Sequence, residues 1–288
     1  MANNLIFSRK PDHSFLAFAD VAEKAPAALY EGHSDHLSDR YGEVDTKQVI
    51  EIMQDYGYGI TQAAQKRSRK AEDRVYAEHL LSFASRTDSY LRTGEARPEI
   101  VIYNSRNGLS SLKIFTGAFR FICSNGMIAG EGMVQKVRHT KTQIDGVEDA
   151  IRIAAESLPV IMDRIDRFKQ IEMTPAQELM LSAQAAALRW QEDKNEIAAL
   201  DNGSYATERT IGQLAYSARR FEDTGGDLWS VSSRIQEHLI RGGLDVLSVT
   251  NKAPKGKYRV ASPIRSVAEN VRINRGLWDI TEEFAEAA

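Results

Sequence analysis

Basic and aromatic residues gather between positions 103 and 121 of this 288-residue chain. Side chains of these two types hold single-stranded nucleic acid, because cations neutralise phosphates and aromatic rings stack on bases. The stretch contains Tyr103, Arg106, Lys113, Phe115, Phe119, Arg120 and Phe121. The pattern indicates a contact with single-stranded DNA, although scattered solvated side chains are an equally simple interpretation.

The cations are better candidates for this contact than the phenylalanines. If residues 110–125 form a helix, Phe115 and Phe119 share its core face. Lys113 and Arg120, seven residues apart, then share a different face and can line a groove. Further cations lie in a basic turn before this stretch and in the segment after it. The predicted nucleic-acid-binding residues are Arg106, Lys113, Arg120, Lys66, Arg67, Arg69, Lys70, Lys136 and Arg138.

The other reactive side chains lack the partners that catalysis or metal binding needs. His33 and His36 have helical spacing, but a zinc site needs three or four ligands and no third one is near. Cys123 can be paired on paper with His79 or His139 as a nucleophile, but a small buried hydrophobe is its default role. Phosphate-cradling and nucleophile motifs are also missing. We predict no catalytic residue, metal or cofactor, with a metal-dependent nuclease as a minor alternative.

Composition indicates a globular protein. Hydrophobic residues make up 42% and charged residues 27% of the chain. No apolar run approaches the roughly 20 residues that cross a bilayer, and the first residues are too quickly charged for a signal peptide. With Cys123 as the single cysteine, a reducing compartment is the natural setting. We therefore expect a cytoplasmic protein that does not contact a membrane.

The net charge of −3 hides an uneven distribution. Residues 11–60 carry ten acids and three bases, whereas residues 97–142 carry seven bases and two acids. Residues 251–275 carry seven bases and one acid. Basic segments in an acidic chain predict local patches rather than a uniformly basic surface.

The first half of the chain predicts strands with one helix. A helix is expected over 46–56, with Thr46 as a possible N-cap and Gly57 as its stop. Strands are expected at 60–65, at 75–85 and, most clearly, at the β-branched run 99–104. Residues 110–125 are ambiguous: apolar residues recur at helical spacing, while a strand pair is the alternative because β formers are abundant. We favour the helix, followed by an extended segment over 127–139.

The second half predicts helices. They are expected over 146–170, from Thr174-Pro175 to about 194, over 207–220, over 227–241 and over 264–286, with a short strand at 258–260. Strands followed by helices indicate an α+β fold, with a small antiparallel sheet and packed helix before a mainly helical half. The predicted division is 1–142 and 143–288, and the two parts can also form one continuous domain.

Several motifs together resemble the phage/plasmid-like domain-of-unknown-function family (number nine-three-two). The resemblance covers nearly the whole chain and implies a mobile-element context in bacteria. The residues that carry it are Ser38-Asp39-Arg40-Tyr41, His79-Leu80-Leu81, Tyr103-Asn104-Ser105, Ser110-Ser111, Phe119 to Gly126, Leu228-Trp229, Gln236-Glu237, Leu239 to Gly243 and Asn274 to Trp278.

A second similarity is confined to about 97–130. A strand, an Asn-Gly turn and the following basic stretch are similar to the β-turn-helix element of single-strand annealing recombinases of the Rad-fifty-two, Erf, Sak and Red-beta types. In those families this element forms a DNA groove and subunits assemble into rings or filaments. The similarity implies that Arg106, Lys113 and Arg120 contact phosphate and that the protein is a homo-oligomer.

Two non-enzymatic functions remain open from the sequence. The first is an accessory protein that binds single-stranded DNA and anneals complementary strands in recombination. The second is a factor that binds a bacterial host protein, counters host defence or regulates plasmid or phage maintenance. In that case residues 11–60 and the acidic end of the last helix form the partner surface.

Overall fold

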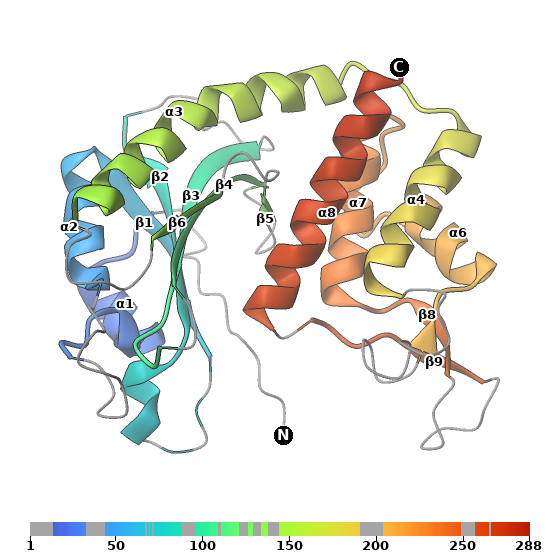
Figure 1. Ribbon diagram of the computed structural model, residues 1–288. Coiled ribbons are helices and arrows are strands. Elements are labelled where there is room, and N and C mark those ends of the chain that lie inside the picture. The colour runs from blue at the N-terminus through green and yellow to red at the C-terminus, as the bar shows by residue number, and fades with distance from the viewer. Residues whose placement is uncertain are drawn as a thin grey trace. The chain divides into compact units, whose positions relative to one another are not determined.

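Figure 1 shows the computed structural model of the chain. It describes residues 14–32, 44–66, 68, 70, 72–87, 96–108, 111–120, 126–128, 134–137, 144–190, 204–248, 257–264 and 266–288. The chain forms two compact units, residues 1–162 (unit 1) and residues 163–288 (unit 2). Each unit is described by itself, and helix α3 (Ile144–Phe168) runs across the boundary in sequence.

A six-stranded antiparallel sheet lies at the centre of unit 1. Strands β1 to β4 are neighbours in space as in sequence, and both β5 and β6 pair with β4. The strands are β1 (Tyr58–Gln65), β2 (His79–Ser85), β3 (Ala96–Asn104), β4 (Leu112–Arg120), β5 (Gly126–Ile128) and β6 (Val134–Val137). The predicted strands at 60–65 and 99–104 are confirmed, and the extended segment 127–139 contains most of β5 and all of β6.

Helices and short 3-10 turns accompany this sheet. They are α1 (Phe18–Lys24), η1 (Pro26–Ala28), α2 (Thr46–Asp55) and η2 (Glu72–Tyr76). The predicted helix at 46–56 is confirmed, but its N-cap is Asp45, whose carboxylate accepts a hydrogen bond from the backbone N–H of Lys47 at 3.0 Å. The predicted strand at 75–85 begins only at His79, because η2 extends to Tyr76.

The core of unit 1 lies on the face of the sheet that meets α2. This face carries residues with no exposed surface, namely Leu81, Phe83, Ile100, Ile102 and Ile114. Thr46 at the start of α2 hydrogen-bonds to His79 and Asn104 of the same face. Val49, Ile50 and Met53 of α2 are fully or almost fully buried. Burial of these apolar side chains supplies the main stabilisation of the unit.

The predicted helix over 110–125 is wrong, because residues 112–120 form strand β4. Ile102 lies opposite Ile114 and Val101 opposite Phe115 along the pair that β4 makes with β3. Both faces of β4 are buried at these positions, so its apolar residues run continuously and also fit a helical repeat. The alternative interpretation, β structure, is correct for the described residues: β4 is a strand of nine residues, and it pairs with β5.

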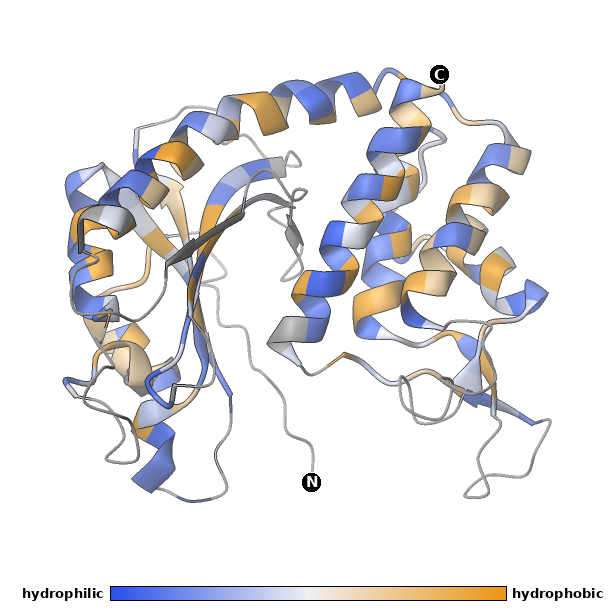
Figure 2. Ribbon diagram, in the orientation of Figure 1, coloured by the Kyte–Doolittle hydropathy of each residue, from blue (hydrophilic) through white to orange (hydrophobic). Residues whose placement is uncertain are grey.

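In the described part of unit 2, three helices pack around a central helix, α7 (Leu228–Arg241). They are α4 (Pro175–Arg189), α6 (Glu208–Tyr216) and α8 (Val267–Glu286), with a 3-10 turn η4 (Phe221–Asp223). Every residue of α7 from Leu228 to Ile240 is buried, and Figure 1 shows α8 alongside it. Figure 2 shows hydrophobic and hydrophilic residues alternating along α8, as expected for a helix with one face in a core.

The ends of these helices follow their sequence signals. Thr174 and Gln177 form a capping box at the start of α4, and Asp227 caps α7 through the backbone N–H of Ser230. Gly242 ends α7 with a φ of +70°, which favours glycine. The predicted helices over 146–170, 207–220, 227–241 and 264–286 are confirmed within a few residues at each end, and α4 ends at Arg189 rather than near 194.

A second, three-stranded antiparallel sheet belongs to unit 2. It consists of β7 (Ser204–Tyr205), β8 (Asp245–Ser248) and β9 (Tyr258–Val260), in that order. The sequence predicted only β9. The α+β class is confirmed, since an antiparallel sheet precedes a mainly helical part. None of the described helices has the length and apolar composition that crossing a membrane requires.

Candidate nucleic-acid interface

Lys113 is the predicted cation that the structure leaves best placed to bind an anion. It lies on β4, where the register sets Tyr103 of β3 on one side and Lys136 of β6 on the other. Its ammonium group lies 5.4 Å from the centre of the Tyr103 ring, a cation–π contact. Lys113 is partly exposed, and no carboxylate among the described residues forms an ion pair with it.

Tyr103 and Glu78 connect Lys113 to a second predicted cation, Lys66. Tyr103 is 4% exposed, and burial, followed by the negative charge of Glu78, raises the pKa of its phenol. The phenol therefore stays neutral. Glu78 also pairs with Lys66, whose ammonium lies 2.8 Å from a carboxylate oxygen and whose side chain is 60% exposed. We call this set of residues the β3–β4 cation row. It consists of three lysines, Lys66, Lys113 and Lys136, together with Glu78 and Tyr103, which connect the first two.

The cation row can bind phosphate but cannot stack on bases. Residues opposite each other on antiparallel strands lie about 4.5–5.5 Å apart, so the positions of Lys113 and Lys136 are close enough to serve neighbouring phosphates. The Tyr103 ring is buried and already carries Lys113 on its face. Glu78 compensates the charge of Lys66, which leaves Lys113 as the main cation of the row, with the register position of Lys136 beside it.

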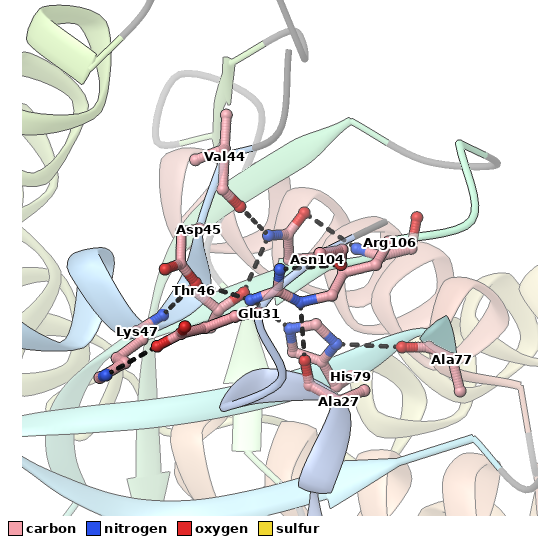
Figure 3. Close-up of polar contacts among 12 residues, drawn as sticks. Ala27, Glu31, Val44, Asp45, Thr46, Lys47, Ala77, His79, Asn104 and Arg106 are labelled. Carbon is pink, nitrogen blue, oxygen red and sulfur yellow. Dashed lines mark hydrogen bonds and ion pairs between the residues drawn. The ribbon is translucent and has the colours of Figure 1, made fainter. Parts of the chain in front are cut away.

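Arg106 does not contribute to this surface, contrary to the sequence prediction. Its side chain is almost fully buried, and Figure 3 shows its guanidinium beside Ala27 and Asp45. It donates to the carbonyl oxygens of Ala27 and Gly32 and forms an ion pair with Asp45 at 2.6 Å. These partners are up to 79 residues away in sequence, so its role is to hold unit 1 together.

A threonine and a histidine beside Arg106 form a polar network that resembles a nucleophile and its base. Thr46 Oγ1 lies 2.8 Å from His79 Nε2, and Asn104 donates to the same hydroxyl at 2.9 Å. His79 Nδ1 lies 3.0 Å from the carbonyl oxygen of Ala77, which fits a neutral ring with its proton on Nδ1. All three side chains are fully buried. Without access for a substrate, this network is structural (Figure 3).

Two further predicted cations that lie within the described residues, Arg120 and Lys70, do not join Lys113. Position 120 is seven residues from 113 on the same strand, and an odd separation places the two positions on opposite faces of the sheet. Lys70 is exposed and lies 3.8 Å from a carboxylate oxygen of Glu72. Arg67, Arg69 and Arg138 lie outside the described residues.

The alternative chemistries gain no support from the described part of the chain. There, no three His, Cys, Asp or Glu side chains are grouped closely enough to hold a metal ion. The predicted histidine pair, His33 and His36, and the predicted buried cysteine, Cys123, lie outside the described residues. A further cation, Arg97, is withdrawn from the surface by a buried ion pair with Glu99, with exposed side-chain fractions of 2% and 0%.

The comparisons with known proteins agree on one family. The family model described as "Domain of unknown function (DUF932)" matches residues 34–278. The UPF0380 protein YafZ of Escherichia coli (strain K12) is 30% identical over 286 residues, which cover 98% of this chain and 94% of that protein. The UPF0380 protein YfjQ of the same organism is 29% identical over 285 residues, with the same shares covered. No solved structure matches the chain.

Proposed function

The chain belongs to the DUF932 family, and from this premise we propose that it is a DNA-binding accessory protein of phages and plasmids that holds single-stranded DNA. Family membership confirms the first resemblance found in the sequence. The mobile-element context is part of the proposal and rests on that resemblance. The proposed phosphate contacts are Lys113 and Lys136, with Lys66 at the edge of the row.

The observation that carries the proposal is the state of Lys113. Arg97 and Arg106 form buried ion pairs, whereas Lys113 remains partly exposed and makes a cation–π contact with Tyr103. A lysine in this state keeps its charge available for a phosphate. The neighbouring position, Lys136, adds a second charge in register. Because the whole chain has a net charge of −3, attraction of DNA has to come from such local groups.

Single strands suit the described structure better than duplex DNA. A helix that reads the major groove must present side chains to the base edges. In unit 2 the central helix α7 is buried along its length, and its Arg234 is bound to internal carbonyl oxygens. Among the predicted nucleic-acid-binding cations, the partly exposed Lys113 lies on strand β4, and a sheet surface can bind a flexible single strand.

We expect the Lys113→Ala, Lys136→Ala double variant to bind single-stranded DNA more weakly than the wild type. Each phosphate contact on a single strand contributes about 0.7 to the slope of log affinity against log salt, so the slope should become less steep by about 1.4. The measurement is fluorescence anisotropy with a labelled oligothymidylate at several salt concentrations, with circular dichroism to verify folding.

Lys47→Ala is the matched control for this experiment. Lys47 is also a lysine of unit 1, its side chain is 42% exposed, and it pairs with Glu31 at 3.1 Å rather than lying in the cation row. Its loss should leave affinity and slope unchanged. Equal affinities and slopes for the control and the double variant would remove the cation row from the proposal.

A second candidate function, binding of a host protein, is favoured by exposed apolar groups in unit 2. Phe221 of η4 is 88% exposed, and Tyr216 and Met180 are 55% and 56% exposed. Exposed apolar residues that cluster mark protein contacts. A wild-type chain with no measurable affinity for the oligothymidylate at low salt would make this candidate the leading one.

A further inference from the structure

The small sheet of unit 2 presents aromatic rings on its more exposed face. Tyr205 of β7, Leu247 of β8 and Tyr258 of β9 are register partners and form one row across the three strands. Tyr258 is 49% exposed, and the other two are partly exposed. The opposite face carries Ser204, Val246 and Ser248, which are buried. The sheet therefore has one core face and one face open to a ligand.

One face of the Tyr258 ring is already occupied by an arginine. The guanidinium carbon of Arg209 lies 5.3 Å from the ring centre. Asp245 of β8 holds this arginine, with its carboxylate 2.7 Å from a guanidinium nitrogen. Asp245 fixes the position of the Arg209 side chain and neutralises its charge. The arginine therefore packs against the Tyr258 ring and does not supply a free charge. The exposed part of the Tyr258 ring is available for stacking with a base.

The residue before Tyr258 is an exposed lysine, whose side chain belongs to the opposite face of the sheet because side chains alternate along a strand. The carbonyl oxygen of this residue, Lys257, accepts a hydrogen bond from the backbone N–H of Ser248 at 3.0 Å. The backbone at Lys257 therefore continues the pairing between β8 and β9. On the core side of the sheet, Arg259 donates to the hydroxyl of Ser204 at 2.7 Å, which ties β9 to β7.

We propose that the Tyr205–Leu247–Tyr258 row is a stacking platform for the bases of single-stranded nucleic acid. Aromatic rings on a sheet, bordered by cations, are a recurrent way to bind unpaired bases. This inference rests on the proposed function and completes it, because the β3–β4 cation row has charges but no exposed ring.

The test uses the full chain and a single strand that contains 2-aminopurine, whose fluorescence is quenched by stacking. We expect Tyr258→Ala to weaken binding on the order of tenfold and to lose part of the quenching. Tyr258→Phe should retain both, because the ring remains. The slope of affinity against salt should stay unchanged, since tyrosine carries no charge.

Tyr216→Ala is the matched control, because Tyr216 is an exposed tyrosine of the same unit outside the platform. If Tyr258→Ala is unstable, Tyr205→Ala provides the same test from the neighbouring strand. The platform would be overturned if Tyr258→Ala and Tyr205→Ala weakened binding no more than the control Tyr216→Ala. That result would leave the cation row in place. A wild-type chain that does not bind the strand at all would overturn the proposed function and the platform together.

Discussion

Replacing Arg106 with methionine is expected to lower the free energy of unfolding of unit 1 by about 3–5 kcal/mol. The change leaves the carbonyl oxygens of Ala27 and Gly32 without this donor and leaves Asp45 without its cationic partner. Removing one partner of a buried pair is costly because the other group stays desolvated. The guanidinium also joins three segments that are distant in sequence, so η1 and the start of α2 should loosen together.

Urea unfolding followed by circular dichroism, with hydrogen exchange at the amides of α2 and β3, measures this effect. Arg152→Met is the control: Arg152 forms ion pairs with Asp149 and Glu156 but is 50% exposed. Exposed pairs of this kind contribute little to stability, because solvent screens the charges. Similar losses in the two variants would contradict the structural role assigned to Arg106.

Arg234→Met should destabilise unit 2 to a similar extent, about 3–5 kcal/mol. Arg234 is 5% exposed and lies within the central helix α7. It donates to the carbonyl oxygens of Ala215, Asp223 and Gly225 and pairs with Glu178 of α4 at 2.8 Å. One side chain thus links α7 to α4, to the end of α6 and to the loop around η4.

Tryptophan fluorescence reports on this change directly, because Trp190, Trp229 and Trp278 all belong to unit 2 and are buried. Arg272→Met is the control, since Arg272 pairs with Glu269 within the first turns of α8 and its side chain is 45% exposed. An unfolding midpoint for Arg234→Met that equals that of Arg272→Met would show that the internal hydrogen bonds contribute little.

The elements that follow local signals could be predicted from the sequence. Thr174 and Pro175 start α4 where the capping and proline preferences place it, and Gly242 ends α7. Strand β4 could not be predicted in this way. Its residues are buried on both faces, so alternation disappears, and the pairing with β3 decides its conformation.

The candidate sites depend even more on distant contacts. Lys66 and Lys113 could be recognised as cations, but Glu78 and Tyr103 connect them only through the sheet. Arg106 could not be assigned to the interior, because its partners lie 61 to 79 residues earlier. The aromatic row in unit 2 needs three strands, two of which the sequence did not predict.

The structure also limits the proposal to binding. Strand annealing and ring assembly were expected from a β-turn-helix element, and the helix of that element is replaced by strand β4. The similarity to annealing recombinases therefore loses the structural feature on which it was based. Binding of a single strand does not need that feature, because its proposed phosphate contacts are Lys113 and Lys136 on the sheet of unit 1.

The most direct test of the account is the salt dependence of the wild-type affinity for a labelled single strand. Two proposed phosphate contacts, at Lys113 and Lys136, predict a slope of log affinity against log salt of about −1.4, at about −0.7 per contact. Binding that is absent at low salt, or that does not change between about 50 and 200 mM salt, would contradict the claim that local cations hold DNA.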